Sequence, residues 1–199
     1  MNMQQKKLQS KGTWRTLSSK KIYRNPWIIV REDAIIHPNG KKGIYGVVEI
    51  PPGIFVIAQN SDKKILLIKQ SRYPTGITSW ELPGDGLKVD RTKKQQALEE
   101  LQEEALMSAQ SFKPLGKTQT QPGITDEIDY FFLATNLTVS GLKERGRAPL
   151  EEGVFGRAFF THTQIRKMIA RGSISHAQTI TGYFLLLLYD SNDFMQNKK

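Results

Sequence analysis

The sequence contains no cysteine, so disulfide bonds and zinc sites built from thiolates are excluded. It also has no apolar run of the roughly 20 residues that a membrane-spanning helix requires. Its longest apolar stretch, Y-F-L-L-L-L-Y at 183–189, is too short to span a bilayer and indicates a buried helix. Residues 1–11 lack the apolar core of a secretory signal. We therefore expect a cytoplasmic protein with no membrane partner.

The sequence has fewer acidic than basic residues: it contains 19 Asp and Glu and 29 Lys and Arg, so its formal net charge is +10. Such a surplus permits binding to nucleic acid, to a membrane surface or to phosphorylated small molecules. The basic residues are scattered in pairs, and the sequence has neither a long basic tract nor a helix-turn-helix pattern. We therefore expect attraction of anionic small ligands and do not expect nucleic acid as a partner.

The chain of 199 residues is long enough for a domain with a sizeable core. We predict a basic flexible tail at 1–13, an N-terminal β region at 14–50, a main domain at 51–191 and a second tail at 192–199. The segment 138–153 is predicted as a long loop of the kind that is usually functional or mobile.

Apolar periodicity alternates between strand and helix patterns along the main domain. Strands are predicted over 43–50, 54–59, 64–69, 112–120, 129–135 and 154–160, and helices over 162–171 and 177–190. The turn N-S-D-K at 60–63 is predicted to join the second and third strands as a hairpin. This order predicts an α+β fold in which a mixed β-sheet packs between helices.

Carboxylates are concentrated in one further helix, predicted to begin at Thr92, whose T-x-x-Q spacing is that of a capping box. Glu100, Glu103 and Glu104 are three and four residues apart, so they project over an arc of about 100°. The adjoining arc is apolar and consists of Ala97, Leu98, Leu101 and Ala105. Like-charge repulsion penalises such a cluster unless a cation binds, which predicts a hard divalent ion with oxygen ligands. The alternative is the solvated acidic face of a surface helix.

Residues 80–107, W-E-L-P-G-D-G-L-K-V-D-R-T-K-K-Q-Q-A-L-E-E-L-Q-E-E-A-L-M, resemble a degenerate Nudix box. The family pattern is G, five residues, E, seven residues, R-E, an aliphatic residue, one residue, E-E, one residue, G. Its matching positions are Glu100, Leu101, Glu103 and Glu104, and its departures are Asp85, Arg91, Glu99 and Leu106.

Similarity to the ADP-ribose and nucleoside diphosphate sugar pyrophosphatase branch of the Nudix hydrolases extends beyond the box, from about Trp14 to the last helix. The matching segments are N-P-W-I-I-V-R-E-D at 25–33, P-N-G at 38–40, Y-G-V-V-E at 45–49, K-Q-S-R-Y-P-T-G at 69–76, Q-P-G-I-T-D-E at 121–127, F-F-L-A at 131–134, L-E-E-G at 150–153 and A-Q-T-I at 177–180. The resemblance implies an α/β/α sandwich with an additional N-terminal antiparallel sheet. It also implies hydrolysis of the pyrophosphate bond of ADP-ribose or a related nucleoside diphosphate sugar, giving a nucleoside monophosphate and a sugar phosphate.

The same resemblance implies a metal site occupied by Mg²⁺, with Mn²⁺ as the alternative ion. Its ligands would be Glu100, Glu104 and the backbone carbonyl of Gly84, with Glu103 as a further ligand or as a partner of one. The general base would be Glu152, beside Glu151 in a mobile acidic loop, and the alternative is that both are ordinary solvated charges of that loop.

Several departures from the family pattern bear on this site. Val154 stands where the family often has a second loop acid. Arg91 and Glu99 invert the signs of the box, and we interpret them as a salt bridge whose members have exchanged positions. The alternative is drift in a protein that kept the fold and lost its chemistry. Glu81 is predicted either to orient the site or to be a polar residue at a sheet edge.

Substrate binding is assigned by resemblance. Arg72 would bind the diphosphate, which a guanidinium fork suits well. Trp27 and Tyr45 would sandwich the nucleobase across a homodimer formed by the N-terminal β region, although Trp27 has a core position as its alternative. Ile50 replaces a usual arginine. Glu127 would contact the distal ribose or sugar, or hold the loop that carries Gly123.

Two other functions remain open at this point. The first is a catalytically weakened Nudix-fold sensor or binding protein for a nucleotide sugar. The second is an mRNA-cap or dinucleoside-polyphosphate hydrolase, against which the W-E-L-P-G context argues. The three histidines, His37, His162 and His176, have no acidic or histidine neighbour at ligand spacing and receive no role.

Overall fold

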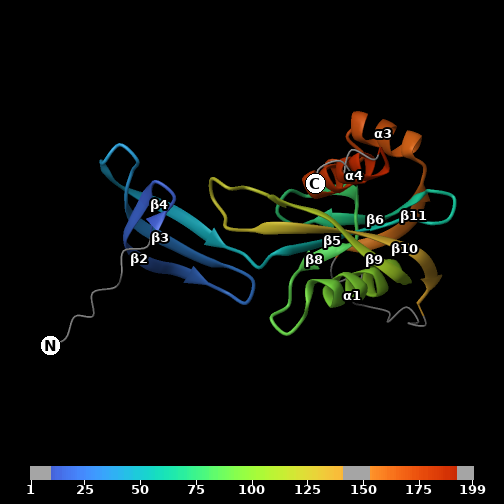
Figure 1. Cartoon of the computed structure of the whole chain (residues 1–199), viewed down its shortest axis with the longest axis horizontal. Helices are drawn as coiled ribbons and strands as arrows, with labels where there is room; N and C mark the ends of the chain where they lie inside the picture. Colours follow the sequence, from blue (N-terminus) through green and yellow to red (C-terminus); the bar gives the residue numbers. More distant parts are fainter. Residues whose placement is uncertain (1–9, 141–152, 192–199) are drawn as a thin grey trace, which may run out of the picture. The chain divides into compact units, whose positions relative to one another are not determined.

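The computed structural model of the chain describes residues 10–140 and 153–191. By its contacts the chain divides into two compact units (Figure 1). The N-terminal unit comprises Met1–Pro51 together with Gln119–Glu127, and the main unit comprises Pro52–Thr118 and Ile128–Lys199.

The N-terminal unit is a four-stranded antiparallel sheet in the order β1-β2-β3-β4. Its strands are β1 (Ser10–Lys11), β2 (Trp14–Arg24), β3 (Ile29–Ile36) and β4 (Lys42–Glu49). This confirms the predicted N-terminal antiparallel sheet. Strand β2 leaves most of its side chains exposed, whereas β3 buries alternate residues, as the twofold period of a strand requires.

The segment Gln119–Glu127 is held against β4 within this unit. The Val48 amide donates to the Ile124 carbonyl at 2.9 Å, and the Tyr45 hydroxyl donates to the Gly123 carbonyl at 2.8 Å. The Ile50 amide donates to Asp126 Oδ1 at 3.2 Å. The Q-P-G-I-T-D-E segment is therefore part of the N-terminal unit, although it lies some 70 residues further along the chain.

The main unit contains two sheets. The first has the order β8-β5-β10-β9 and is mixed, because β5 (Gly53–Ala58) runs parallel to β10 (Ile128–Val139) and antiparallel to β8 (Gly84–Gly86). Strand β9 (Met107–Gln119) forms its edge. The second has the order β11-β6-β7, with β6 (Ile65–Arg72) antiparallel to both β7 (Ile77–Glu81) and β11 (Val154–Phe160).

The predicted hairpin between the second and third strands is wrong. The turn itself forms, with the Asn60 amide donating to the Lys64 carbonyl at 3.0 Å. Only the single bridge Gln59↔Ile65 follows it, after which β5 and β6 enter different sheets. Strand β5 instead pairs with β10, so its hydrogen bonds are satisfied by a strand from far along the sequence.

Helices cover both faces of β5, which is buried throughout. On one face, Ile54, Val56 and Ala58 pack with α1 (Lys93–Ala105). On the other, Phe55 and Ile57 pack with α3 (His162–Ala170) and α4 (Ala177–Asp190) (Figure 1). The expected mixed sheet between helices is therefore confirmed.

The apolar run at 183–189 lies in α4 and contributes Tyr183 and Leu186 to the core, as predicted. A side chain at Gly182 would meet Leu82 at 2.6 Å, so the glycine allows α4 to approach the sheet closely. No helix among the described residues has both the length and the apolar character needed to cross a membrane.

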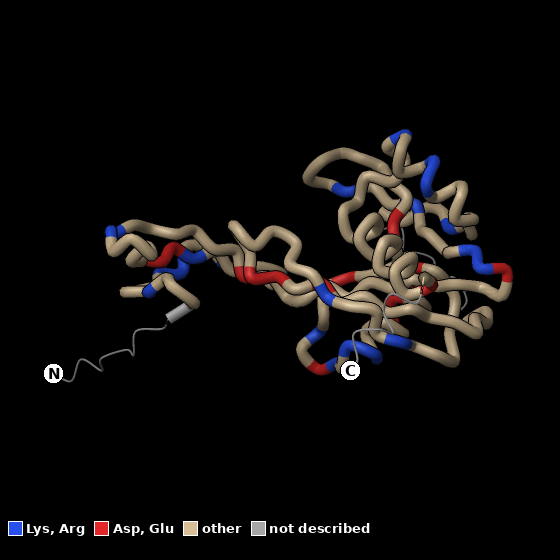
Figure 2. Tube along the Cα trace, turned by 45° about the horizontal axis from the view of Figure 1, so that its top comes forward, with Lys and Arg blue, Asp and Glu red and all other residues tan. Residues whose placement is uncertain are grey.

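Charged residues of both signs are distributed along the described parts of both units (Figure 2). Lysine and arginine segments alternate with acidic ones along the trace instead of collecting on one element. This distribution agrees with the scattered basic pairs of the sequence.

Candidate active site

Helix α1 carries the acidic residues and begins as the sequence predicts. Thr92 is its N-cap, and both halves of the capping box with Gln95 are present. The side chains of Ala97, Leu101 and Ala105 pack into the core beside β5 and β6. This packing fixes the rotation of the helix, which decides where each carboxylate lies.

Glu100 and Glu104 are almost completely buried, with 4% and 3% of their surface exposed. Glu104 Oε2 accepts a hydrogen bond of 2.7 Å from the Gly84 amide, which joins α1 to β8. Glu100 accepts a hydrogen bond from the side-chain amide of Gln96. Glu103 is exposed and lies at the rim. The structure thus brings Glu100, Glu104 and Gly84 together and leaves Glu103 at their solvent edge.

Burial raises the pKa of Glu100 to about 7, against the opposing effect of the Gln96 hydrogen bond. Asp85 and Glu103 raise this pKa further, and Lys88 lowers it. A buried carboxylate in this state gains stability from a cation, which would favour its charged form. The donor set is hard oxygen, which suits Mg²⁺ or Mn²⁺.

These two buried carboxylates fit a divalent ion as part of its ligand set. Within residues 10–140 and 153–191, no three Asp, Glu or His side chains are grouped in a way that could hold a metal ion. The proposed base Glu152 and its neighbour Glu151 lie outside the described residues. Val154, at the start of β11, is buried in the same apolar cluster as Ala97 and Leu101.

The side chain of Arg72, at the end of β6, forms an ion pair with the buried carboxylate of Glu81. Its Nε and Nη2 donate to the same oxygen of Glu81, Oε2, at 3.1 and 2.7 Å. Glu81 is only 1% exposed, whereas the Arg72 side chain is 40% exposed. Glu81 does lie on an edge strand, but it is buried and orients Arg72, which favours the first of its two predicted roles.

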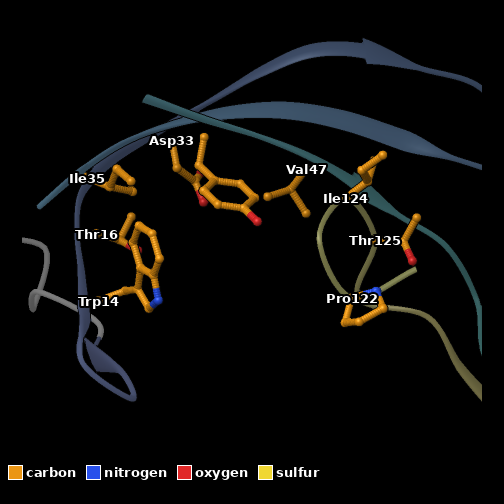
Figure 3. Close-up of a pocket in the computed structure, with 9 residues that line it drawn as sticks. Trp14, Thr16, Asp33, Ile35, Val47, Pro122, Ile124 and Thr125 are labelled. Atoms are coloured by element: carbon orange, nitrogen blue, oxygen red, sulfur yellow. The ribbon is translucent and has the colours of Figure 1, made fainter. Parts of the chain in front are cut away.

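A cavity of about 250 Å³ opens in the N-terminal unit (Figure 3). Trp14 and Tyr45 meet edge-on in it, with ring centroids 5.8 Å apart and planes at 83°. Its lining residues are Trp14, Thr16, Asp33, Ile35, Tyr45, Val47, Pro122, Ile124 and Thr125. Trp14 had no predicted role, since the only sequence signal at this position is the start of the family resemblance.

Trp27 is 72% exposed, so its core alternative is wrong. It lines a separate hollow of the N-terminal unit, with Glu49 and Asp126 among its neighbours. Trp27 and Tyr45 therefore occupy different hollows of one chain. Glu127 is partly buried at the end of the segment that closes this unit.

Comparison with known proteins identifies the family. Residues 49–181 match the model of the NUDIX domain, which is more than half of the chain. The chain belongs to the Nudix family. Residues 14–48 match a second model, the nucleoside diphosphate sugar hydrolase N-terminal domain. The pair of models places the chain in the ADP-ribose and nucleoside diphosphate sugar branch, whose members are pyrophosphohydrolases.

Individual relatives agree with this assignment. The chain is 31% identical to an ADP-ribose pyrophosphatase of Bacillus subtilis over 63% of this chain and 68% of the relative. It is 29% identical to an ADP-ribose pyrophosphatase of Mycobacterium tuberculosis over 84% of this chain and 80% of the relative. The fold is similar to the crystal structure of an ADP compounds hydrolase, with a TM-score of 0.77 and 16% identity over 93% of this chain and 98% of that chain.

The inverted charges of this Nudix box form the predicted salt bridge. Arg91 Nε donates to Glu99 Oε1, and Arg91 Nη1 also bonds Asp90. The predicted salt bridge between Arg91 and Glu99 is therefore confirmed. These contacts raise the pKa of Arg91, with the Glu99 hydrogen bond as the largest cause.

A lysine that sequence reasoning missed lies beside this pair. Lys88 Nζ is 3.6 Å from Glu99 Oε2 and 4.0 Å from Glu103 Oε2. Desolvation, the largest single influence, lowers the pKa of Lys88, but the neighbouring carboxylates, led by Glu103, together raise it above its ordinary value. Nothing in the Nudix pattern marks this position, which only the path of the loop between β8 and α1 brings to the acidic helix.

Leu106 stands where the pattern of the Nudix box has its last glycine. It is the C-cap of α1 and adopts φ 54°, ψ 31°, the left-handed region. Leucine is strained in this conformation, whereas glycine is not. The box position thus keeps its backbone geometry without its usual residue.

Proposed function

We propose that this protein hydrolyses the pyrophosphate bond of ADP-ribose or a related nucleoside diphosphate sugar, releasing a nucleoside monophosphate and a sugar phosphate. The observation that carries the proposal is the buried pair Glu100 and Glu104 at Gly84, where the Glu104 hydrogen bond measures 2.7 Å. Two carboxylates buried on one helix face are costly unless a cation binds them. The relatives named above support the choice of an ADP compound.

The metal would be bound by Glu100, Glu104 and the Gly84 carbonyl, with Glu103 as a rim ligand or a partner of one. When bound, Mg²⁺ or Mn²⁺ neutralises charge on the phosphate oxygens. Arg72 then contributes a fixed cation for the same diphosphate, because Glu81 anchors two of its N–H groups.

Glu152 would accept the proton of the attacking water, with Glu151 beside it. Water forms the new P–O bond as the bridging P–O bond breaks, and the leaving phosphate carries away that electron pair. A carboxylate is a suitable base when it lies within hydrogen-bond reach of the water. The 12 residues outside the described part of this region, 141–152, include both acids.

Base recognition would use Trp27 of one copy and Tyr45 of another, in a homodimer built through the N-terminal β region. Exposure of Trp27 and of most of β2 supports a partner for this sheet. Each good base stack contributes roughly 1–3 kcal/mol to binding. Glu127 would contact the distal ribose or support the loop that carries Gly123. Light scattering in solution tests the dimer, and a monomeric mass contradicts it.

Hydrolysis is tested by phosphorus NMR of ADP-ribose and a panel of nucleotide sugars incubated with the protein, with and without Mg²⁺. The matched control is Glu100→Gln/Glu104→Gln, which keeps side-chain volume and removes both charges. We expect metal-dependent release of a nucleoside monophosphate that the control abolishes. Binding without turnover by the wild-type protein contradicts the hydrolase and favours the nucleotide-sugar sensor.

A further inference from the structure

The side chain of His176 has no predicted role, yet it lies in the most buried polar cluster near Arg72. His176 is the N-cap of α4, but its ring makes no capping hydrogen bond to the helix backbone. Its Nδ1 lies instead 3.4 Å from Glu81 Oε2 and 3.1 Å from Thr179 Oγ1. The ring therefore bonds Thr179 and also contacts the carboxylate that holds Arg72.

The backbone around His176 is fixed to the strand that carries Glu81. The Trp80 amide donates to the Ser173 carbonyl at 3.1 Å, and the Ser175 amide donates to Ser79 Oγ at 3.1 Å. Phe55 also packs edge-on against the ring of His176, with 5.8 Å between centroids. His176 thus has little freedom to turn away from Glu81.

Thr179 completes the cluster from the first turn of α4. It is 1% exposed, and its hydroxyl accepts a hydrogen bond of 2.9 Å from the Leu82 amide. The same oxygen contacts His176 Nδ1. Thr179 therefore ties the ring of His176 to the residue that follows Glu81 in the chain.

The geometry of the guanidinium shows what this cluster achieves. Both bonds from Arg72 to Glu81 use the Nε and Nη2 side, so the Nη1 group is on the opposite edge. Because Glu81 already fixes one edge of the Arg72 guanidinium, the side chain loses little conformational entropy when an anion binds to the other edge. Any movement of the Glu81 carboxylate would move this edge with it.

We propose that His176 and Thr179 are positioning residues that hold Glu81 and, through it, set the orientation in which Arg72 meets the substrate diphosphate. This inference rests on the proposed function, in which Arg72 binds that diphosphate. The ring proton would lie on Nδ1, where it faces Glu81 Oε2. Thr179 Oγ1 at 3.1 Å faces the same nitrogen and can accept from it.

The charge state of the ring agrees with this arrangement. Burial, aided by the charge of Arg72, lowers the pKa of His176 to about 4. The ring is then neutral at physiological pH, and only one of its two nitrogens carries a proton. The facing ionisable groups are Glu81 and Arg72, which already form an ion pair with each other.

The test is a binding cycle by calorimetry with ADP-ribose in metal-free buffer, beside KM and kcat with Mg²⁺. We expect Arg72→Ala to weaken binding about 100-fold, as loss of a charge-assisted hydrogen bond to phosphate does. We expect His176→Ala to weaken binding about tenfold and to raise KM in parallel while leaving kcat nearly unchanged. In the Arg72→Ala background, His176→Ala should then have less than a twofold effect, since coupled residues are not additive.

Two variants separate positioning from a general loss of structure. His176→Asn keeps an N–H donor near Nδ1 and should restore binding to within about twofold of wild type. His162→Ala is the matched control, because His162 contacts Tyr183 and not the Arg72 cluster. It should leave Kd and KM unchanged.

The outcomes also separate this inference from the function on which it rests. If Arg72→Ala does not weaken ADP-ribose binding, the proposed role of Arg72 fails and the inference fails with it. If Arg72→Ala weakens binding but His176→Ala does not, only the positioning role is overturned. Equal effects of His176→Ala with and without Arg72 overturn it as well, because they indicate a contribution that does not pass through the guanidinium.

Discussion

Glu100→Gln should stabilise the metal-free protein at alkaline pH, although it removes a proposed metal ligand. The carboxylate is 4% exposed, and its side-chain neighbour Gln96 is a neutral donor. Glutamine keeps an oxygen that can accept the Gln96 hydrogen bond and carries no charge to bury. The substitution therefore removes the cost of a buried anion while keeping the packing of α1.

The sign and size follow from the pKa of Glu100, which rises from 4.5 to about 7 on folding. The folded state holds the Glu100 proton more tightly, so the contribution of this group to stability is largest below pH 4.5 and is lost as the pH rises through 7. At 1.36 kcal/mol per pKa unit the loss above pH 7 is about 3 kcal/mol, an order-of-magnitude figure. For a chain of this size that corresponds to a melting temperature about 6 to 12 °C lower.

The assay is the melting temperature of both proteins between pH 4.5 and 9, in buffer with a chelator and again with Mg²⁺. The difference between the two proteins isolates Glu100, because His176, which acts in the opposite direction, is present in both. The His176 pKa falls from 6.5 to about 4, so its contribution is present above pH 6.5 and is lost as the pH falls through 4. We expect the glutamine variant to be more stable at pH 8 and equal to wild type near pH 4.5.

Mg²⁺ should then raise the melting temperature of wild type at pH 8 and have little effect on the variant, since a ligand stabilises the state that binds it. A variant that is less stable than wild type at pH 8 without metal would refute the reasoning. So would a difference that does not change with pH. Either result would mean that the Glu100 carboxylate is stabilised by contacts other than those in the structure.

Three further predictions concern the base site and the Nudix box. Tyr45→Ala or Trp27→Ala should each raise KM for ADP-ribose, by about 5- to 150-fold for a stack of roughly 1–3 kcal/mol, and an unchanged KM in steady-state kinetics contradicts the stacking role. Arg91→Glu should lower the melting temperature, and the double exchange Arg91→Glu/Glu99→Arg should restore it. Both effects should become smaller as salt is added. Additive effects of the two substitutions would show that the two side chains do not stabilise each other. Leu106→Gly should raise the free energy of unfolding in urea by about 1 kcal/mol by relieving the left-handed strain, and a decrease shows that leucine packing outweighs it.

The local elements of the fold could be predicted because their signals are local. Helices α3 and α4 were predicted over 162–171 and 177–190 and end within one residue of those limits. Their boundaries depend on caps and on apolar periodicity, which neighbouring residues determine. The pairing of β5 with β10 depends instead on residues more than 70 positions apart, so a compact turn was wrongly extended into a hairpin.

The candidate site divides in the same way. Glu100 and Glu104 could be named from spacing alone, since a helix fixes which side chains share a face. The contacts of Lys88 and His176 could not, because they depend on a loop path and on the docking of α4 against β7. From the sequence, Glu81 could either orient the site or be a polar residue at a sheet edge. Its burial beside Arg72 favours the first role.

This Nudix box departs from the family pattern at charged positions, and only some of the altered charges are neutralised by a neighbour. The charges that are not neutralised affect the buried carboxylates. The inverted signs at Arg91 and Glu99 are compensated, because the two residues form a salt bridge and their formal charges cancel in either order. Asp85 is not, because its charge helps to raise the pKa of the buried Glu100. That effect makes a bound cation more favourable, since an ion at the carboxylates would be attracted by Asp85 as well. The altered box therefore keeps the two buried carboxylates of the proposed metal site, and Asp85 would strengthen the attraction of a cation to them.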